Sequence, residues 1–144
     1  MKNKKIIFLD IDWVLNKYSS DDLNIDFDNT LINNLKKIIK ETWALIVISS
    51  DWKYDMIELF QKWPISLPMY IDSTEKMYKE KWTLEEIRVK EIKNWLEYYH
   101  SMKYNIKYIV LDDMKLDIEN FIQVDNHTWL TIKNTNDAID KLNA

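Results

Sequence analysis

The chain has 144 residues, of which 47% are hydrophobic, and its formal net charge is −4. This length and hydrophobic content suit one folded domain with a buried core and exclude an intrinsically disordered chain. Acidic and basic residues are interspersed, which argues against nucleic-acid binding through bulk charge, and the absence of cysteine excludes disulfides and thiolate metal sites.

The chain opens with a basic segment followed by the apolar run Ile6–Leu9. This run predicts a strand buried on both faces, because it is continuously apolar rather than alternating. It is too short for the core of a signal peptide, and no run in the chain reaches the roughly 20 apolar residues of a membrane span. We therefore expect a soluble, cytoplasmic protein with no membrane partner.

Polar and apolar segments alternate over the next part of the chain. Continuous apolar runs predict further buried strands, and apolar residues at helical spacing predict amphipathic helices. In chain order, the pattern predicts a polar loop over residues 17–28, a helix from Asp28 or Asn29 through Lys40, a strand at Ala44–Ile48, and a helix that Asp51 caps and Pro64 ends. The loop is a candidate flap over the sheet edge discussed below.

The second half continues the alternation of strands and helices. It predicts a short strand within residues 65–71, a polar loop over 72–82, a helix of about Leu84–Met102, buried strands at Ile106–Leu111 and Phe121–Val124, an extended piece at Trp129–Ile132, and a closing helix at Asn136–Leu142. Strands that alternate with helices indicate an α/β fold with a mainly parallel sheet. We expect residues 1–144 to form one domain.

Polar residues follow three of the predicted buried strands. The carboxyl ends of parallel strands share one edge of a sheet, so these residues should converge although they are far apart in sequence. Any one set could instead cap the segment that follows it, and only the convergence of all three argues for a site. The sets are Asp10 with Asp12, Ser49 with Ser50, and Asp112 with Asp113.

Asp10 and Asp12 are the most informative of these residues. Their spacing of two places both side chains on the same side of an extended chain. Two carboxylates that lie so close repel each other unless a cation lies between them, and a hard cation such as Mg²⁺ suits oxygen ligands. One of the two aspartates would then be free to attack an electrophile.

These residues resemble the motifs of the haloacid dehalogenase-like (HAD) superfamily of aspartate-nucleophile phosphatases. The first motif of that superfamily is Asp-x-Asp, the second a Ser or Thr, the third a Lys or Arg near the start of a later helix, and the fourth an acidic pair. The matching residues are Asp10 as nucleophile and Asp12 as general acid/base, Ser49 with Ser50 close behind, Arg88 or Lys90, and Asp112-Asp113 followed by Asp117.

The chain is more similar still to a compact subgroup, the HAD domains of predicted RNA-repair (Swiss Army Knife) proteins. The resemblance covers nearly the whole chain, and the order of its motifs is specific. It rests on Phe8–Asn16, Ser49–Lys53, Arg88–Leu96, Leu111–Asp113 and Trp129–Thr131. In this alignment Arg88, rather than Lys90, takes the place of the third motif.

The resemblance implies a Rossmann-like HAD domain without a large cap and an Mg²⁺-dependent phosphomonoester hydrolase with an aspartyl-phosphate intermediate. It implies phosphorylated substrates, with nucleotide or nucleic-acid end phosphates as candidates. The implied metal ligands are Asp10, the Asp12 carbonyl and Asp113, with Asp112 or Asp117 orienting metal-bound waters, while Ser49 and Arg88 hold the phosphoryl oxygens and Ser50, Asn16 and Lys90 support the substrate.

Two other functions remain open at this point. One is a non-catalytic domain that keeps the acidic pocket to bind a cation or a phosphorylated partner, and the other is a phosphotransferase of the same fold. Turnover of a generic phosphoester separates the binding domain from the enzymes, and dependence on an acceptor separates transfer from hydrolysis. The oligomeric state is also left open.

The chain has no glycine but has seven tryptophans. Where the family motifs have glycine, this chain has Trp13 and Trp129, and the same replacement is plausible at Trp43, Trp63 and Trp82. Our hypothesis is that a codon read as glycine in the source, UGA above all, was translated here as tryptophan. The alternative is a chain that lacks glycine by design or by natural substitution. Sequencing of the gene decides between them, because UGG codons at Trp13, Trp43 and Trp129 would exclude recoding.

Overall fold

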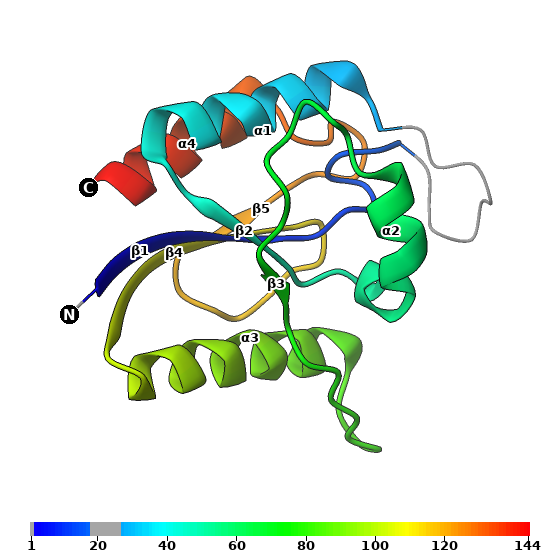
Figure 1. The fold of residues 1–144 in the computed structure, drawn as a ribbon. Helices are drawn as coiled ribbons and strands as arrows, with labels where there is room; N and C mark the ends of the chain where they lie inside the picture. The colour runs from blue at the N-terminus through cyan, green and yellow to red at the C-terminus, as the bar shows by residue number, and fades with distance from the viewer. Residues whose placement is uncertain (1, 18–26) are drawn as a thin grey trace.

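A five-stranded, all-parallel sheet forms the centre of the computed structural model, which describes residues 2–17 and 27–144 (Figure 1). The strands are ordered β3-β2-β1-β4-β5, so β1 is central and flanked by β2 and β4. This order brings the three polar strand ends next to one another. The strands are β1 (Lys2–Leu9), β2 (Leu45–Ile48), β3 (Asp72–Ser73), β4 (Tyr104–Asp112) and β5 (Phe121–Gln123).

Helices cover both faces of the sheet. Figure 1 shows α1 and α4 on one face, α3 on the other, and α2 beyond the carboxyl ends of the strands. This arrangement confirms the predicted Rossmann-like α/β fold, and no large cap is present among the described residues. The helices are α1 (Asn29–Thr42), the 3₁₀ helix η1 (Asp51–Asp55), α2 (Met56–Lys62), α3 (Leu84–Ser101) and α4 (Ile132–Asn143).

The continuous apolar run of β1 is explained by burial on both faces. Ile7 and Leu9 belong to the core beneath α1 and α4, whereas Ile6 and Phe8 belong to the core beneath α3. Successive side chains of a strand point to opposite faces, so a strand covered on both sides needs apolar residues at every position. On the α3 side, Phe8 packs edge-on against Trp95, with ring centroids 5.2 Å apart.

Three predicted elements differ from the structure. The short strand predicted within residues 65–71 is wrong, because the strand is Asp72–Ser73 and begins one residue after that range. Pro68 lacks the N–H that a ladder position requires, and Ile65 is exposed. The polar loop predicted over residues 72–82 therefore contains an edge strand of only two residues, which no periodic pattern could reveal.

The predicted extended piece Trp129–Ile132 is also wrong, because Ile132 already begins α4. Thr131 and Asn134 form a capping box, in which each side chain accepts a hydrogen bond from the backbone N–H of the other residue. The third error is the Asp51 cap. Ser50 caps η1 by accepting from the N–H of Trp52, and Asp55 caps α2.

Only the two ends of the loop predicted over residues 17–28 lie among the described residues. Residues 18–26, which make up most of the loop and the candidate flap, lie outside the described residues. Asp28, at its end, caps α1 by accepting hydrogen bonds from the N–H groups of Thr30 and Leu31, as the sequence predicted. Within residues 2–17 and 27–144, no helix combines the length and the apolar character needed to cross a bilayer.

Three tryptophans occupy backbone conformations that favour glycine. Their φ angles are 65° at Trp13, 60° at Trp43 and 55° at Trp129. Only glycine enters the left-handed region without a steric penalty from Cβ, which amounts to about 1–2 kcal/mol for other residues. These angles support the view that glycine belongs at these three positions.

Trp43 occupies the position after α1 in which helices most often have glycine. It is left-handed, its N–H bonds to the carbonyl of Ile39, and its side chain is 87% exposed. Trp63, by contrast, has a φ of −59°, and Trp82 is not among the described residues with positive φ. Backbone geometry therefore gives no support to glycine at Trp63 or Trp82.

Candidate active site

The ends of β1, β2 and β4 meet at one edge of the sheet. Leu9 is in register with Ile48 on one side and with Leu111 on the other. The ladder continues beyond the strands, because the N–H of Asp10 donates to the Leu111 carbonyl (3.0 Å) and the N–H of Ser49 donates to the Leu9 carbonyl (3.1 Å). The backbone at Asp10 and Ser49 is thus fixed by hydrogen bonds of the sheet, which also fixes where their side chains begin.

Three carboxyl groups from two of these strand ends form a cluster. One oxygen from each of Asp10, Asp112 and Asp113 lies within 4.8 Å of the others, and Asp10 and Asp112 are buried. Burial and the charge of Asp112 raise the pKa of Asp10 well above its ordinary value, although Arg88 opposes this. Burial likewise raises the pKa of Asp112. A cation would relieve both the burial penalty and the mutual repulsion.

The donor set fits a hard divalent ion. Carboxylate oxygens are the ligands that Mg²⁺ and Ca²⁺ prefer, and the three groups are close enough to share one ion. The cluster is also shielded from solvent at Asp10 and Asp112, so protein ligands rather than bulk water would compensate the ion's charge. Asp10, Asp112 and Asp113 are therefore the residues that could hold a metal.

Arg88 brings a positive charge to the same cluster from the first turns of α3. Its guanidinium lies 2.8 Å from Asp112 Oδ2, 3.1 Å from Asp51 Oδ1 and 3.4 Å from Asp10 Oδ1. Burial by itself would lower the pKa of Arg88, but the charges of Asp10 and Asp112 raise it, so the side chain stays positive. A fixed cation beside Asp10 can hold an anionic ligand there.

Hydrogen bonds from two neighbouring side chains orient the carboxyl group of Asp12. Its Oδ1 accepts hydrogen bonds from the indole N–H of Trp52 (3.0 Å) and from the side-chain amide of Asn16 (3.1 Å). The Asn16 side-chain oxygen in turn accepts from the backbone N–H of Trp13 (3.3 Å). Asn16 thus closes the turn after Asp12 and fixes its carboxyl group, which is consistent with a supporting role.

The two serines after β2 have different surroundings. Ser50 Oγ accepts a hydrogen bond from the N–H of Trp52 and so caps η1. Ser49 Oγ is buried at the strand end, and no hydrogen-bond partner for it exists among the described residues. A buried hydroxyl without a partner costs free energy, and a ligand oxygen at this edge would supply the missing bond.

The structure does not bring every predicted residue to the cluster. Lys90 is half-buried on α3, and no contact with the acidic cluster is seen for it in the described part of the chain, whereas Arg88 contacts Asp10 directly. Asp117 is exposed and lines a separate cavity with Lys93 and Tyr108. Among the third- and fourth-motif candidates, Arg88, Asp112 and Asp113 therefore lie at the site, while Lys90 and Asp117 do not.

Sequence reasoning missed a buried ion pair beside Arg88. Lys53 Nζ lies 2.6 Å from Glu91 Oε2 and also donates to Thr74 Oγ1 (3.0 Å), and both charged side chains are almost fully buried. Glu91 additionally accepts from the N–H of Met77 (3.2 Å). Burial lowers the pKa of Lys53, while Glu91 opposes the shift. Lys53 and Glu91 both lie within the segments on which the family resemblance rests, and this position was the only sign in the sequence that connected them with the site.

Trp13→Gly is expected to raise the turnover of a phosphate ester. Trp13 adopts φ 65°, and its N–H binds the Asn16 oxygen that belongs to the support of Asp12. Glycine would adopt this conformation without steric cost. The turn between Asp12 and Asn16 would then be free of strain, and Asn16 would orient Asp12 better. The measurement is phosphate release by the two proteins at equal concentration. Equal or lower turnover in the glycine variant would contradict this prediction.

Trp43→Gly provides the matched control. Trp43 shares the left-handed conformation, but it precedes β2 and so lies at the opposite edge of the sheet from the acidic cluster. Its replacement should raise the free energy of unfolding by about 1 kcal/mol and leave turnover unchanged. If turnover rises in both variants, the gain in Trp13→Gly comes from higher overall stability and not from the turn beside Asp12.

Comparison with known proteins agrees with this geometry. No curated protein and no solved structure matches the chain. A family model described as "HAD domain in Swiss Army Knife RNA repair proteins" matches residues 6–135, which include the buried half of β1, the acidic cluster and most of the elements around it. HAD domains are typically metal-dependent phosphoesterases, which suits a cluster of buried carboxylates beside an arginine. The chain therefore belongs to the family of HAD domains found in Swiss Army Knife RNA repair proteins.

Proposed function

We propose that the protein hydrolyses phosphate monoesters with Mg²⁺ and an aspartate nucleophile, and that its substrates are phosphates at nucleotide or nucleic-acid ends. The observation that carries this proposal is the convergence of Asp10, Asp112 and Asp113 with Arg88 at the edge of the sheet. The family to which the chain belongs supports phosphoesterase chemistry of the HAD type and a phosphorylated nucleic-acid substrate.

Each residue of the site has a chemical role in this proposal. Asp10 and Asp113, with Asp112 beside them, hold Mg²⁺, which neutralises phosphate charge when bound. Arg88 and the Ser49 hydroxyl, which has no partner in the described part of the chain, hold the phosphoryl oxygens beside Asp10. These contacts would hold the phosphoryl group beside the Asp10 carboxylate, and burial would keep bulk water away from the reaction.

The reaction then proceeds in two steps. An oxygen of Asp10 bonds to phosphorus as the bond to the leaving oxygen breaks, and Asp12 transfers a proton to that oxygen. In the second step Asp12 takes a proton from water, which attacks phosphorus and releases phosphate and free Asp10. Trp52 and Asn16 bind one oxygen of Asp12, Oδ1, and so set the direction of its carboxyl group.

Removal of the metal tests the proposal. Release of phosphate from an aryl phosphate is expected with Mg²⁺, to be lost in excess chelator and to return when Mg²⁺ is restored, because the carboxylate cluster would otherwise repel an anionic substrate. The measurement is the initial rate of phosphate release as a function of Mg²⁺ concentration. Full activity in chelator would overturn the metal-dependent mechanism.

The same assay separates the alternatives. A non-catalytic binding domain would bind Mg²⁺ or inorganic phosphate, measured by calorimetry, without releasing phosphate from any ester. A phosphotransferase would need an acceptor alcohol and would form a new ester in proportion to it. Phosphate release that is independent of added acceptor is the result expected for a hydrolase.

A further inference from the structure

A cavity of about 250 Å³ lies beside the candidate active site, at the start of α3. Arg88 belongs to both places, because it lines the cavity and its guanidinium lies 3.4 Å from Asp10 Oδ1. Asp51, which also lines the cavity, lies 3.1 Å from the other terminal nitrogen of the same guanidinium. The cavity is therefore one guanidinium group away from the proposed nucleophile.

One face of α3 forms a wall of the cavity. The residues of α3 that line it recur at intervals of three and four, as residues on one helix face do: Leu84, Ile87, Arg88 and Glu91. Helical side chains tilt toward the start of their helix, and α3 starts at the end of the sheet where the strands end (Figure 1). Leu84 lies one turn before Arg88, about 6 Å along the axis, so the apolar part of this wall adjoins the guanidinium.

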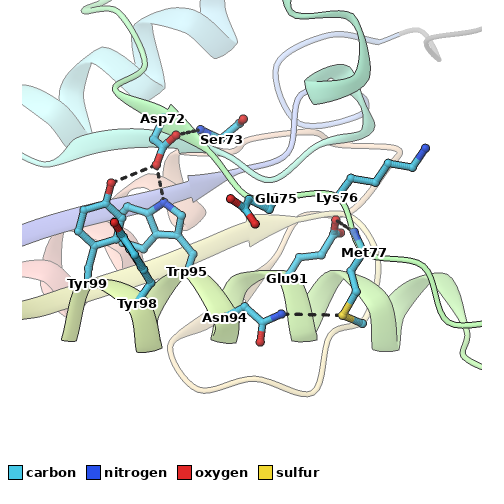
Figure 2. A pocket seen from close by; sticks show the side chains of 10 residues that line it. All are labelled: Asp72, Ser73, Glu75, Lys76, Met77, Glu91, Asn94, Trp95, Tyr98 and Tyr99. Atoms are coloured by element: carbon cyan, nitrogen blue, oxygen red, sulfur yellow. Dashed lines mark hydrogen bonds between the residues drawn. The ribbon is translucent and has the colours of Figure 1, made fainter. Parts of the chain in front are cut away.

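The segment between β3 and α3 forms the other wall, through Lys76, Met77 and Tyr78. Met77 fixes this segment to α3. Its N–H donates to Glu91 Oε2 (3.2 Å), and its sulfur accepts from the side-chain amide of Asn94 (3.8 Å), as Figure 2 shows. Tyr78 follows Met77 directly, so these contacts hold its backbone beside the start of α3.

The charges that line the cavity balance. Two carboxylates, Asp51 and Glu91, stand against two cations, Lys76 and Arg88. Each carboxylate also has a cationic partner, because Asp51 is paired with Arg88 and Glu91 with Lys53. The lining therefore has no excess of negative charge that would repel a nucleotide.

Apolar surface dominates the rest of the lining. Tyr78 is 77% exposed and Leu84 is 69% exposed, while Met77 and Ile87 are half-buried. Exposed apolar side chains beside a polar site gain free energy when a flat ring covers them, and an exposed tyrosine ring offers a stacking face. A volume of about 250 Å³ is below that of sites for drug-sized ligands, so it suits a single ring system.

We propose that this cavity binds the base of the nucleotide whose phosphate lies at Asp10, with the base stacked on Tyr78 and in contact with Leu84 and Ile87. The proposal rests on the proposed function, because it assumes that the phosphate occupies the acidic cluster. Aromatic side chains stack on every base, since each base has a π-face. The cavity thus selects nucleotides over sugar phosphates and discriminates little among the four bases.

Substrates with and without a base test the proposal. The wild-type protein is expected to hydrolyse nucleoside monophosphates with a kcat/KM at least about fivefold above that for the matching ribose phosphates, mainly through a lower KM. Tyr78→Ala should reduce kcat/KM for the nucleotides by about 5- to 150-fold and so remove most of this preference. Tyr78→Phe keeps the ring and should keep the preference.

Two further substitutions control the result. Leu84→Gln keeps a good helix former at an exposed position but removes apolar surface, so it should weaken the preference less than Tyr78→Ala does. Tyr98→Ala is the matched control, because Tyr98 is also an exposed tyrosine but lies outside this cavity, about 15 Å beyond Arg88 along α3, and its loss should change nothing. Equal kcat/KM for nucleotides and ribose phosphates in the wild type, or equal effects of Tyr78→Ala and Tyr98→Ala, would overturn the proposal while leaving the proposed function intact.

Binding of a nucleoside without phosphate separates this proposal from the proposed function. In saturation-transfer NMR, the base protons of adenosine should receive magnetisation from the wild-type protein and less from Tyr78→Ala. If adenosine binds in this way but no phosphate ester is hydrolysed, the base site stands and the proposed function fails. If adenosine does not bind and no ester is hydrolysed, both proposals are overturned.

Discussion

Asp10→Asn is expected to lower the rate of phosphate release by about 10⁴-fold or more, as removal of a covalent nucleophile does in other enzymes. The amide has the same shape but cannot form the acyl phosphate. The protein should stay folded, because the substitution removes a buried charge that Asp112 repels, although it also loses the attraction of Arg88. The measurements are steady-state phosphate release and the free energy of unfolding.

Two related substitutions control this result. Asp51→Asn changes another carboxyl group that contacts Arg88, but its side chain is 64% exposed, so we expect a loss of less than about tenfold. Asp12→Asn should still form the aspartyl-phosphate from an aryl phosphate with a good leaving group, yet hydrolyse it slowly, so that labelled protein accumulates. Normal turnover by Asp10→Asn in a folded protein would exclude Asp10 as the nucleophile.

Lys53→Met is expected to lower the free energy of unfolding by about 3–5 kcal/mol, because it leaves the charge of Glu91 buried without its partner. The pair has its atoms 2.6 Å apart and side-chain exposures of 2% and 4%. It joins η1 to α3 one helical turn after Arg88, so its loss should also displace Arg88 and lower turnover. Chemical denaturation and phosphate release are the measurements.

The double variant Lys53→Met/Glu91→Leu separates the two causes. It removes both charges, so most of the stability should return, while turnover should stay low if the pair also positions Arg88. Lys133→Met is the matched control, because its ion pair with Asp137 is exposed on α4 and should contribute less than about 1 kcal/mol. Similar losses in Lys53→Met and Lys133→Met would refute the special role of the buried pair.

The fold and the family were predictable because their signals are local. Ile6–Leu9 and Ala44–Ile48 are apolar at every position, as a strand covered on both faces requires, and they correspond to the buried part of β1 and to β2, which begins at Leu45. Asp28 is a favoured cap residue ahead of apolar residues at helical spacing, and it caps α1. Of the five tryptophans that the sequence offered as replaced glycines, Trp13, Trp43 and Trp129 have the left-handed conformation that favours glycine, whereas Trp63 has a φ of −59° and Trp82 is not among the described residues with positive φ.

The sequence by itself also placed Asp10, Ser49 and Asp112 at strand ends, and parallel topology makes such ends meet. Only the tertiary structure decided among neighbouring candidates. Arg88 rather than Lys90 reaches Asp10, because residues two apart on a helix point to nearly opposite sides. Ser49 rather than Ser50 has a hydroxyl without a partner among the described residues, because the start of η1 uses the Ser50 oxygen as its cap.

Two side-chain contacts between distant segments could not be predicted from the sequence. Lys53 and Glu91 are 38 residues apart, and Trp52 and Asp12 are 40 apart, so no local pattern links either pair. The edge strand Asp72–Ser73 is too short to show the alternation of polar and apolar residues that identifies a strand. It forms because its backbone pairs with that of the neighbouring β2. Residue types thus determined which elements form and which chemistry they carry, whereas packing of the elements determined which side chains meet.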